Sequence, residues 1–172
     1  ISTSPRKGGN SDTLADEFVR GAQEAGNNVE KIALYDHTIG FCKGCLACQK
    51  TQRCVIRDDA DTIAQKMLTA DILVFATPIY YYGICGQMKT MLDRANPLFS
   101  ADYQFRNIYL LAAAAEENEH TADGAVTALK GWIDCFEKSR LSGIVFAGGV
   151  TSVGDIRNHP ALKKAYEMGR AV

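Results

Sequence analysis

Four cysteines have the most distinctive spacing in this sequence, Cys-x2-Cys-x2-Cys-x5-Cys: Cys42, Cys45, Cys48 and Cys54. Three-residue steps let thiolates converge on one centre, as in the compact cysteine runs that ligate iron-sulfur clusters, although Val55 stands where a proline often follows. Structural zinc sites more often use two separated cysteine pairs. The spacing favours a cluster over zinc, and packed free thiols, a reversible disulfide or redox-sensing cysteines remain open.

The second feature is a polar, glycine-containing loop, Ser2–Ser11, that leads directly into a helical pattern. Glycines allow a tight turn, and free amides at a helix start point at an anion, so the loop is suited to a phosphate. It matches neither GxGxxG nor GxxxxGK[ST], which excludes the dinucleotide and triphosphate fingerprints. The alternative is that Asn10 or Ser11 caps the helix and the loop is an ordinary connector.

The third feature is an aromatic stretch, Thr77–Lys89, with three consecutive tyrosines, a proline and two glycines. It follows an apolar strand, and open α/β folds bind ligands at the carboxyl ends of their strands. Such a stretch can form a flat wall for a planar ring such as an isoalloxazine. Alternatively, the tyrosines are packing residues or a subunit contact. Lys89 and Arg94 either bring positive charge to this site or are solvated, and solvation is the commoner case.

Apolar runs of strand length alternate with helical periodicity, which is typical of parallel strands joined by crossover helices. Ile1 stands where the last residue of a further first strand would, and we expect that strand to begin before it. The long segment Tyr35–Asp59 exceeds ordinary crossover loops, which favours a functional loop. The predicted strands are Val29–Leu34, Asp71–Thr77, Arg106–Ala113 and Leu141–Gly148. The predicted helices are Ser11–Ala25, Ala60–Ala70, Gln87–Arg94, Ala122–Lys138 and Ala161–Arg170.

Composition bounds the function classes. The 172 residues are 47% hydrophobic, which suits one domain over residues 1–172 with a single sizeable core. Nineteen basic and twenty acidic side chains give a net charge of -1 without a basic, aromatic-rich surface, so we expect no nucleic-acid partner. No apolar run approaches a membrane span. Six cysteines with an ample apolar core favour a reducing cytoplasm over a secreted disulfide scaffold.

The phosphate and aromatic stretches together resemble the flavodoxin-like NAD(P)H-dependent FMN reductase family. The matching residues are Ser4-Pro5-Arg6, Gly9-Asn10-Ser11, Thr77-Pro78-Ile79-Tyr80, Gln87-Met88-Lys89 and Asp93-Arg94. The resemblance implies an α/β, doubly wound, five-stranded parallel sheet in the order 2-1-3-4-5 with helices on both faces. It implies an FMN phosphate at Ser4, Arg6, Gly9, Asn10 and Ser11. The flavin ring would be flanked by Pro78, Ile79, Tyr80, Tyr81, Tyr82, Gly83 and a third loop near Ala114.

The resemblance also implies an enzyme that takes electrons from NAD(P)H and passes them to a small acceptor such as flavin, a quinone or a nitro-aromatic. Because the cofactor carries the hydride chemistry, no protein acid or base is nominated as catalytic. His37, His120 and His159 are expected to be surface or capping residues. By analogy we expect a homodimer or homotetramer.

The four-cysteine spacing is similar to that of iron-sulfur flavoproteins, a branch of this fold with a [4Fe-4S] cluster near FMN. This similarity implies an alternative function, an electron carrier with a ferredoxin-like partner. A redox sensor or metal-binding module built on the cysteine run is a third reading. We expect Cys85 and Cys135 to be packing residues.

Overall fold

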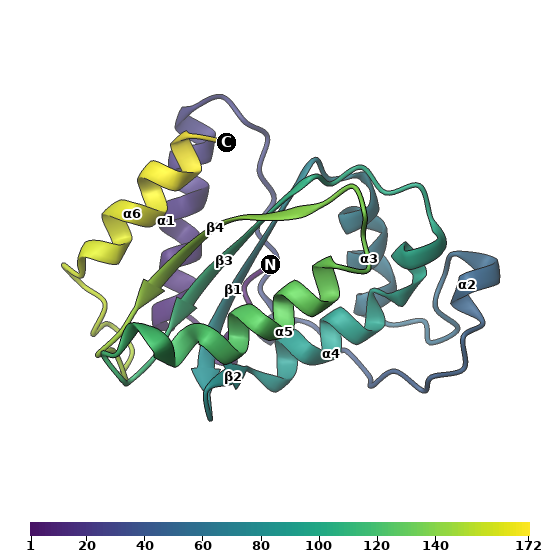
Figure 1. Cartoon of the computed structure of the whole chain (residues 1–172), viewed down its shortest axis with the longest axis horizontal. Coiled ribbons are helices and arrows are strands. Elements are labelled where there is room, and N and C mark those ends of the chain that lie inside the picture. Colours follow the sequence, from purple (N-terminus) through teal and green to yellow (C-terminus); the bar gives the residue numbers. More distant parts are fainter.

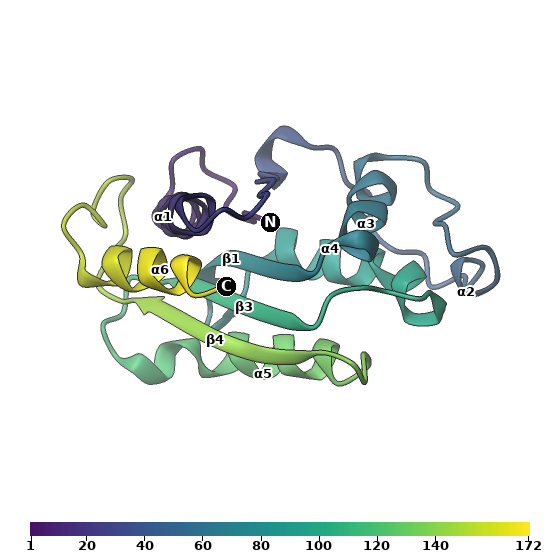
Figure 2. The same cartoon turned by 90° about the horizontal axis from the view of Figure 1, so that it is seen from above.

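The computed structural model describes residues 1–172. Its central sheet contains β1 (Ile72–Tyr80), β3 (Asn107–Ala113) and β4 (Arg140–Ala147), which pair in parallel. A short β2 (Gly83–Ile84) pairs antiparallel with the end of β1, which makes the sheet mixed, in the order β2-β1-β3-β4. Figure 2 shows β1, β3 and β4 side by side in this order. The prediction of a purely parallel sheet was wrong because it missed this hairpin.

Helices cover both faces of the sheet, as predicted. The helices α1 (Asn10–Glu24) and α6 (Pro160–Arg170) pack on one face, where their apolar side chains meet those of β3 and β4. The other face is covered by α3, α4 and α5, which enclose the larger core cluster. Their bounds are Asp59–Thr69, Gly86–Arg94 and Asp123–Ile133. Each amphipathic helix therefore packs its apolar face against one of the two faces of the sheet.

The helices α1 and α6 lie side by side in both views (Figure 1, Figure 2) and touch through glycine. A Cβ added at Gly169 would lie 2.1 Å from the Phe18 carbonyl oxygen, and one at Gly21 would lie 2.1 Å from the Tyr166 carbonyl oxygen. The two backbones therefore approach too closely for any side chain at these positions. This packing fixes the direction of α1, which begins at the predicted phosphate loop.

Four of the predicted helices begin and end within one residue of the observed ones: α1, α3, α4 and α6. The predicted helix Ala122–Lys138 instead ends at Ile133 in α5. The chain turns there, and Phe136 packs against Trp132, Tyr103 and Phe105 with ring centroids 4.5 to 5.3 Å apart. Burying this ring outweighs continuing the helix.

The predicted strand Val29–Leu34 was wrong as an extended strand. Its Ala33 forms one parallel bridge to Ser2, and Ser2 bridges Ala76 on its other side. The chain then forms the 3-10 turn η1, Leu34–Asp36. The pairing is short because Ser2 is followed at once by the polar loop.

The cysteine run lies in a long excursion between η1 and α3. It contains only the four-residue helix α2 (Cys48–Thr51), which projects at the far end of the molecule from the arrowheads of the strands (Figure 1). Two further 3-10 turns, η2 (Asn96–Ser100) and η3 (Glu119–Ala122), follow α4 and precede α5. None of the helices has the length and hydropathy that crossing a bilayer requires.

Candidate functional site

The first predicted site element, which we call the phosphate loop (residues 4–11), is held in a tight turn. The Ser4 hydroxyl lies 2.9 Å from the Arg6 carbonyl oxygen and 3.1 Å from the Arg6 amide nitrogen. The Gly9 amide donates to the Arg6 carbonyl oxygen at 3.1 Å. A Cβ at Gly9 would lie 2.6 Å from the Ser4 hydroxyl, so the turn has no room for a side chain there.

The start of α1 has unused hydrogen-bond donors. Gly9 is the N-cap and no side chain caps the helix, which shows that the reading of Asn10 or Ser11 as a simple cap was wrong. The amides of Asn10, Ser11 and Asp12 donate no hydrogen bond within the protein. The Ser11 hydroxyl is buried and has no partner. Free amides, the helix dipole and an orphaned hydroxyl are the donor set that a phosphate requires, so these residues fit the FMN phosphate.

A second loop, residues 150–156, supports the phosphate loop. The Asn10 side chain donates to the Ser152 carbonyl oxygen at 3.0 Å and accepts from the Ile156 amide, and the Arg6 guanidinium donates to the Thr151 carbonyl oxygen at 3.0 Å. Asp155 accepts from the amides of Thr151 and Ser152, and these bonds lower its pKa.

The supporting role of residues 150–156 was not predicted. The glycines around Val150 and Asp155 were the available sequence signal, because they mark a turn at the carboxyl end of the last strand.

Lys31 contacts the first turns of α1. Its ammonium group forms ion pairs with Asp12 at 2.7 Å and Asp16 at 2.5 Å. Burial alone would raise the pKa of Asp12, but hydrogen bonds from Lys31 and from the Gly8 amide bring it below its usual value. Asp12 is therefore ionised, and its charge is engaged by partners instead of facing an incoming phosphate.

The aromatic stretch forms what we call the tyrosine hairpin (residues 79–84). Ile79 pairs with Ile84, and Tyr80 pairs with Gly83. Tyr81 and Tyr82 between them have φ of 49° and 62°, the left-handed values of a two-residue I′ turn. Tyrosine is a strained choice at both positions, and strain of this kind clusters at functional sites.

The hairpin divides the predicted ring-flanking residues into two groups. Tyr80, Tyr81 and Tyr82 are exposed, with Tyr81 fully so at 103%. Pro78 and Ile79 are buried in the protein's own core. The hairpin thus presents three aromatic side chains and the backbone of Gly83 outward, which suits contact with a planar ring or with another subunit.

The hairpin and the phosphate loop meet through Thr3 and Cys85. The Cys85 thiol lies 3.2 Å from both the hydroxyl and the carbonyl oxygen of Thr3, and the Cys85 amide donates to the Thr77 hydroxyl at 3.3 Å. Cys85 is fully buried, in agreement with the predicted packing role. The two loops are therefore joined at the carboxyl edge of the sheet.

The third predicted loop follows β3. Ala114 is buried beside Ile79 in a small apolar cluster, and its amide and carbonyl bond to Ala147 and Val150. It brings the hairpin and the end of β4 together but offers no free polar group. The next residues, Ala115 to Glu117, are exposed.

The four cysteines of the run line one cavity of about 430 Å³. Cys42 and Cys45 are exposed, Cys54 is half-buried and Cys48 is buried. The Asn96 amide donates to the Cys48 sulfur at 3.0 Å. Cys135 borders the same cavity and is exposed, so its predicted place in the core was wrong.

The donor chemistry of this cavity suits a soft metal centre, because thiolates and an amide donor to sulfur are what iron-sulfur sites use. Its geometry does not form a centre as it stands. No group of three or more His, Cys, Asp or Glu side chains is arranged to hold a metal ion. The structure therefore brings the four thiols to one cavity without converging them on one point.

With the geometry described, comparison with known proteins identifies the family. The sequence profile of the NADPH-dependent FMN reductase family matches residues 1–154. The chain belongs to this family. A putative NAD(P)H-dependent FMN-containing oxidoreductase of Bacillus subtilis is 30% identical over 98% of this chain and 93% of its own length. An oxidoreductase that uses FMN and NAD(P)H is thus the expectation that the family supports.

Other relatives of this FMN reductase family member carry a different name. An iron-sulfur flavoprotein of Methanocaldococcus jannaschii is 38% identical over 62% of this chain, and the chain spans 55% of that relative's length. An iron-sulfur flavoprotein of Archaeoglobus fulgidus is 29% identical over 98% of this chain and 75% of its own length. Both comparisons agree with the predicted resemblance to iron-sulfur flavoproteins.

Solved structures support the flavodoxin-like fold. An NAD(P)H:quinone oxidoreductase from Methanothermobacter marburgensis superimposes with a TM-score of 0.77 at 19% identity, over 98% of this chain and 92% of that one. The azoreductase AzrA superimposes with a TM-score of 0.74 at 18% identity, over 99% of this chain and 97% of that one. At these identities the likeness establishes the fold.

The charged and histidine residues considered in the sequence have local partners. Lys89 is exposed on α4 and pairs with Asp93 at 2.6 Å, as a solvated residue would. The His159 ring accepts from the Ala161 amide and so caps α6, while His37 and His120 lie near Asp59 and Asp123. Arg94 differs from these residues, because its side chain is completely buried.

Proposed function

We propose that this chain binds FMN at the carboxyl edge of its sheet and uses it to pass electrons from NAD(P)H to a small acceptor. The observation that carries the proposal is the start of α1, which has three free amides and the unpartnered Ser11 hydroxyl. Family membership supports the same cofactor. When bound, FMN supplies the hydride chemistry, and the protein supplies position and exclusion of competing reactions.

Each predicted residue has a role in this proposal. Gly9 keeps the turn open, and the Asn10, Ser11 and Asp12 amides with the Ser11 hydroxyl hold the phosphate. Ser4 and Arg6 act mainly by fixing the loop, because their polar groups bond within it and to Thr151. The exposed tyrosines and the Gly83 backbone flank the ring, while Pro78, Ile79 and Ala114 shape the floor beneath the hairpin.

The sheet supports the placement of this site. We propose a five-stranded order 2-1-3-4-5 in one domain over residues 1–172. It is supported by the parallel bridges of Ser2 to Ala33 and Ala76, which put the segment before the phosphate loop between two neighbours. In this order the phosphate loop and the tyrosine hairpin follow adjacent strands, at the switch point where open α/β sheets bind ligands.

The acceptor is proposed to be a quinone, a free flavin or a nitro-aromatic, and the working form a homodimer or homotetramer in the cytoplasm. The exposed Tyr80, Tyr81 and Tyr82 support both points, because they offer a flat apolar face to a planar acceptor or to a second copy. The names of the quinone oxidoreductase and the azoreductase that share this fold are consistent with such acceptors.

Stopped-flow measurement of FMN-loaded protein tests this proposal. NADH or NADPH is expected to reduce the bound flavin, and a quinone or nitro-aromatic is expected to reoxidise it. A protein that binds FMN stoichiometrically but whose flavin neither nucleotide reduces would contradict the reductase. Failure to bind FMN at all would contradict the site itself.

A second candidate function is an iron-sulfur flavoprotein that exchanges electrons with a ferredoxin-like partner. It is favoured by the cavity that the four cysteines line and by the names of the archaeal relatives. Anaerobic reconstitution with iron and sulfide should give about four of each per chain. Cys42→Ser should abolish this loading and Cys135→Ser, which changes a cavity thiol outside the run, should not. Zinc bound in place of iron, or a disulfide within the run, would favour the sensor or metal-binding module, and flavin without metal would favour the reductase.

A further inference from the structure

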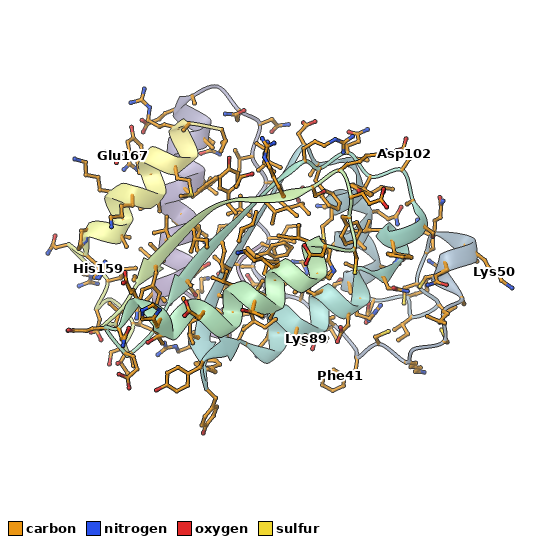
Figure 3. The ribbon with its side chains drawn as sticks, viewed as in Figure 1. Phe41, Lys50, Lys89, Asp102, His159 and Glu167 are labelled. Carbon is orange, nitrogen blue, oxygen red and sulfur yellow. The ribbon has the colours of Figure 1, made fainter.

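The Cys loop (residues 40–58) contains all four cysteines of the run, and its two halves differ. A hydrogen-bonded turn at residues 46–52 and a bond from the Gln52 side-chain amide to the Ser100 carbonyl oxygen hold the second half, whereas the first half has few bonds of its own. From Phe41 to Cys45 the backbone makes no hydrogen bond to another backbone group. Figure 3 shows Phe41 and Lys50 at the surface of this region, and Phe41 is 81% exposed. Leu46 is held at a φ of 58°, which is strained for leucine. The path of residues 41–45 therefore depends on what fixes the loop on either side of them.

Both ends of the Cys loop are fixed by one side chain, Arg94. Its guanidinium donates to the Gly40 carbonyl oxygen at 2.7 Å at the beginning of the loop. It donates to the Ile56 carbonyl oxygen at 3.0 Å and to both Asp58 carboxylate oxygens at 2.7 Å at the end. Asp58 in turn accepts from the Gly40 amide at 2.8 Å. The buried ion pair of Arg94 with Asp58 thus holds the beginning of the loop, at Gly40, next to its end, at Asp58.

The position of Arg94 in the fold makes this contact informative. It is the last residue of α4, whose first residues follow the tyrosine hairpin. Its side chain is 0% exposed, and Asp58 has an exposed fraction of 15%. A buried guanidinium is costly unless it is paired and hydrogen-bonded. The two terminal nitrogens of Arg94 donate four hydrogen bonds in a planar arrangement that lysine cannot reproduce, and Nε alone has no partner.

A neighbouring contact extends the same anchor to the last cysteine. Asp61 of α3 accepts from the Cys54 amide at 3.1 Å and pairs with Arg53 at 2.6 Å and Arg57 at 2.8 Å. The hydrogen bonds to Asp58 raise the pKa of Arg94 above its usual value. Cys54 is therefore placed by Asp61, whereas Cys42 and Cys45 lie in the stretch that has no backbone–backbone hydrogen bond.

We propose that Arg94 is the positioning residue of the cysteine site: its buried pair with Asp58 closes the Cys loop and so holds the four thiols around one cavity. The role concerns the shape of the loop and is independent of whether the thiols take a cluster, a metal ion or a disulfide. It is also independent of FMN binding, because Arg94 makes no hydrogen bond to the phosphate loop or the hairpin.

Site-resolved alkylation tests the proposal, because the chain carries its own reporters. Cys48 lies in the Cys loop with 8% exposure, and Cys85 lies at the base of the hairpin with 0% exposure. Local opening of the loop exposes Cys48 alone, whereas global unfolding exposes both. Iodoacetamide labelling followed by mass spectrometry measures each rate in one sample, and the exposed Cys135 serves as the fast reference.

Arg94→Lys is expected to raise the labelling rate of Cys48 relative to Cys85 by about tenfold, because lysine keeps the charge but loses the bidentate pair. Arg94→Met is expected to raise it by about a hundredfold, since Asp58 is left buried and unpaired. Asp58→Asn provides a second route to the same opening from the other partner. FMN affinity should change less than twofold in all three variants.

Lys89→Gln is the matched control, because it breaks an exposed ion pair on the same helix and should leave every rate unchanged. Figure 3 shows Lys89 on α4. Unchanged Cys48 labelling in Arg94→Lys and Asp58→Asn would overturn the proposal. Equal increases at Cys48 and Cys85 would also overturn it, because Arg94 would then support the whole fold.

Discussion

The carboxyl edge of the sheet and the Cys loop are built in opposite ways. At the carboxyl edge, short loops are bonded to their neighbours through Arg6, Asn10 and Thr77, and the start of α1 has free donors. The Cys loop is long, makes no backbone–backbone hydrogen bond from Phe41 to Cys45 and is closed by the pair of Asp58 with Arg94 of α4. The first region is preorganised for its ligand, and the second takes its shape from its anchors.

This difference has a consequence for how each region fails. Losing one contact at the carboxyl edge should weaken one ligand without loosening the fold, because neighbouring loops support each other. Losing an anchor of the Cys loop should release four thiols together.

The largest effect is expected where α1 crosses α6. Gly169→Ala should destabilise the protein by about 3 kcal/mol, because the new methyl group meets the Phe18 carbonyl backbone. Chemical denaturation measures the free energy of unfolding. Gly131→Ala is the control, since nothing lies within 4 Å of its added Cβ, and it should be neutral or stabilising by about 0.5 kcal/mol. Equal effects of the two variants would show that α1 is not fixed by this contact.

The next effect concerns the pH dependence of the anchors. Hydrogen bonds from Arg53, followed by Arg57, lower the pKa of Asp61 from 3.8 to about 2. A carboxyl group whose pKa is depressed in the folded state stabilises the protein at any pH above the pKa that the group has in the unfolded chain. This contribution is lost as pH falls from about 4 through 2.

Asp61→Asn should therefore cost about 1 to 2 kcal/mol near neutral pH, after allowing for solvent around the exposed arginines, and should flatten the acid limb of the stability curve. Denaturation as a function of pH measures both quantities. Asp102→Asn removes an exposed carboxylate paired with Lys138 and serves as the control. An unchanged acid limb in Asp61→Asn would show that the anchor does not titrate as the geometry requires.

The phosphate loop is expected to be sensitive at Gly9. Gly9→Ala should weaken FMN binding by about tenfold, because the added methyl group meets the Ser4 hydroxyl and opens the turn. Cys48 labelling should be unchanged in this variant, in contrast to the Arg94 variants. Flavin fluorescence quenching measures the affinity. A Gly9→Ala protein that labels faster at Cys48 would show that the two regions are not independent.

The smallest effect is expected at the tyrosine hairpin. Replacing Tyr81 by Asn and Tyr82 by Gly supplies the residues that a I′ turn favours and should stabilise the protein by about 1 kcal/mol. The same double variant should weaken FMN binding, because it removes two exposed rings. Greater stability with unchanged FMN affinity would assign these tyrosines to a subunit contact instead.

Much of the fold could be predicted from the sequence because it depends on local periodicity. The apolar runs gave the cores of β1, β3 and β4, and amphipathic patterns gave α1, α3, α4 and α6 to within one residue at each end. The hairpin was missed because its turn residues, Tyr81 and Tyr82, are not those that usually adopt positive φ. The early end of α5 was missed because it is caused by distant aromatic packing.

The candidate site was predictable to the same degree. Residue type alone indicated the phosphate loop and the aromatic stretch, since glycine, hydroxyl and aromatic side chains act through their own chemistry. The role of Arg94 could not be predicted, because its partner Asp58 lies 36 positions away and an arginine at a helix end is usually solvated. Cys135 was misplaced for the same reason: the helix that would have buried it ends at Ile133.

An FMN titration of three proteins tests most directly whether FMN binds at the start of α1 independently of the Cys loop. The three proteins are the unmodified chain, Gly9→Ala and Arg94→Lys. We expect stoichiometric FMN binding by the unmodified chain, an affinity about tenfold lower in Gly9→Ala and an unchanged affinity in Arg94→Lys. FMN binding that is lost in Arg94→Lys and retained in Gly9→Ala would contradict a flavin site at the start of α1, because the flavin would then depend on the Cys loop.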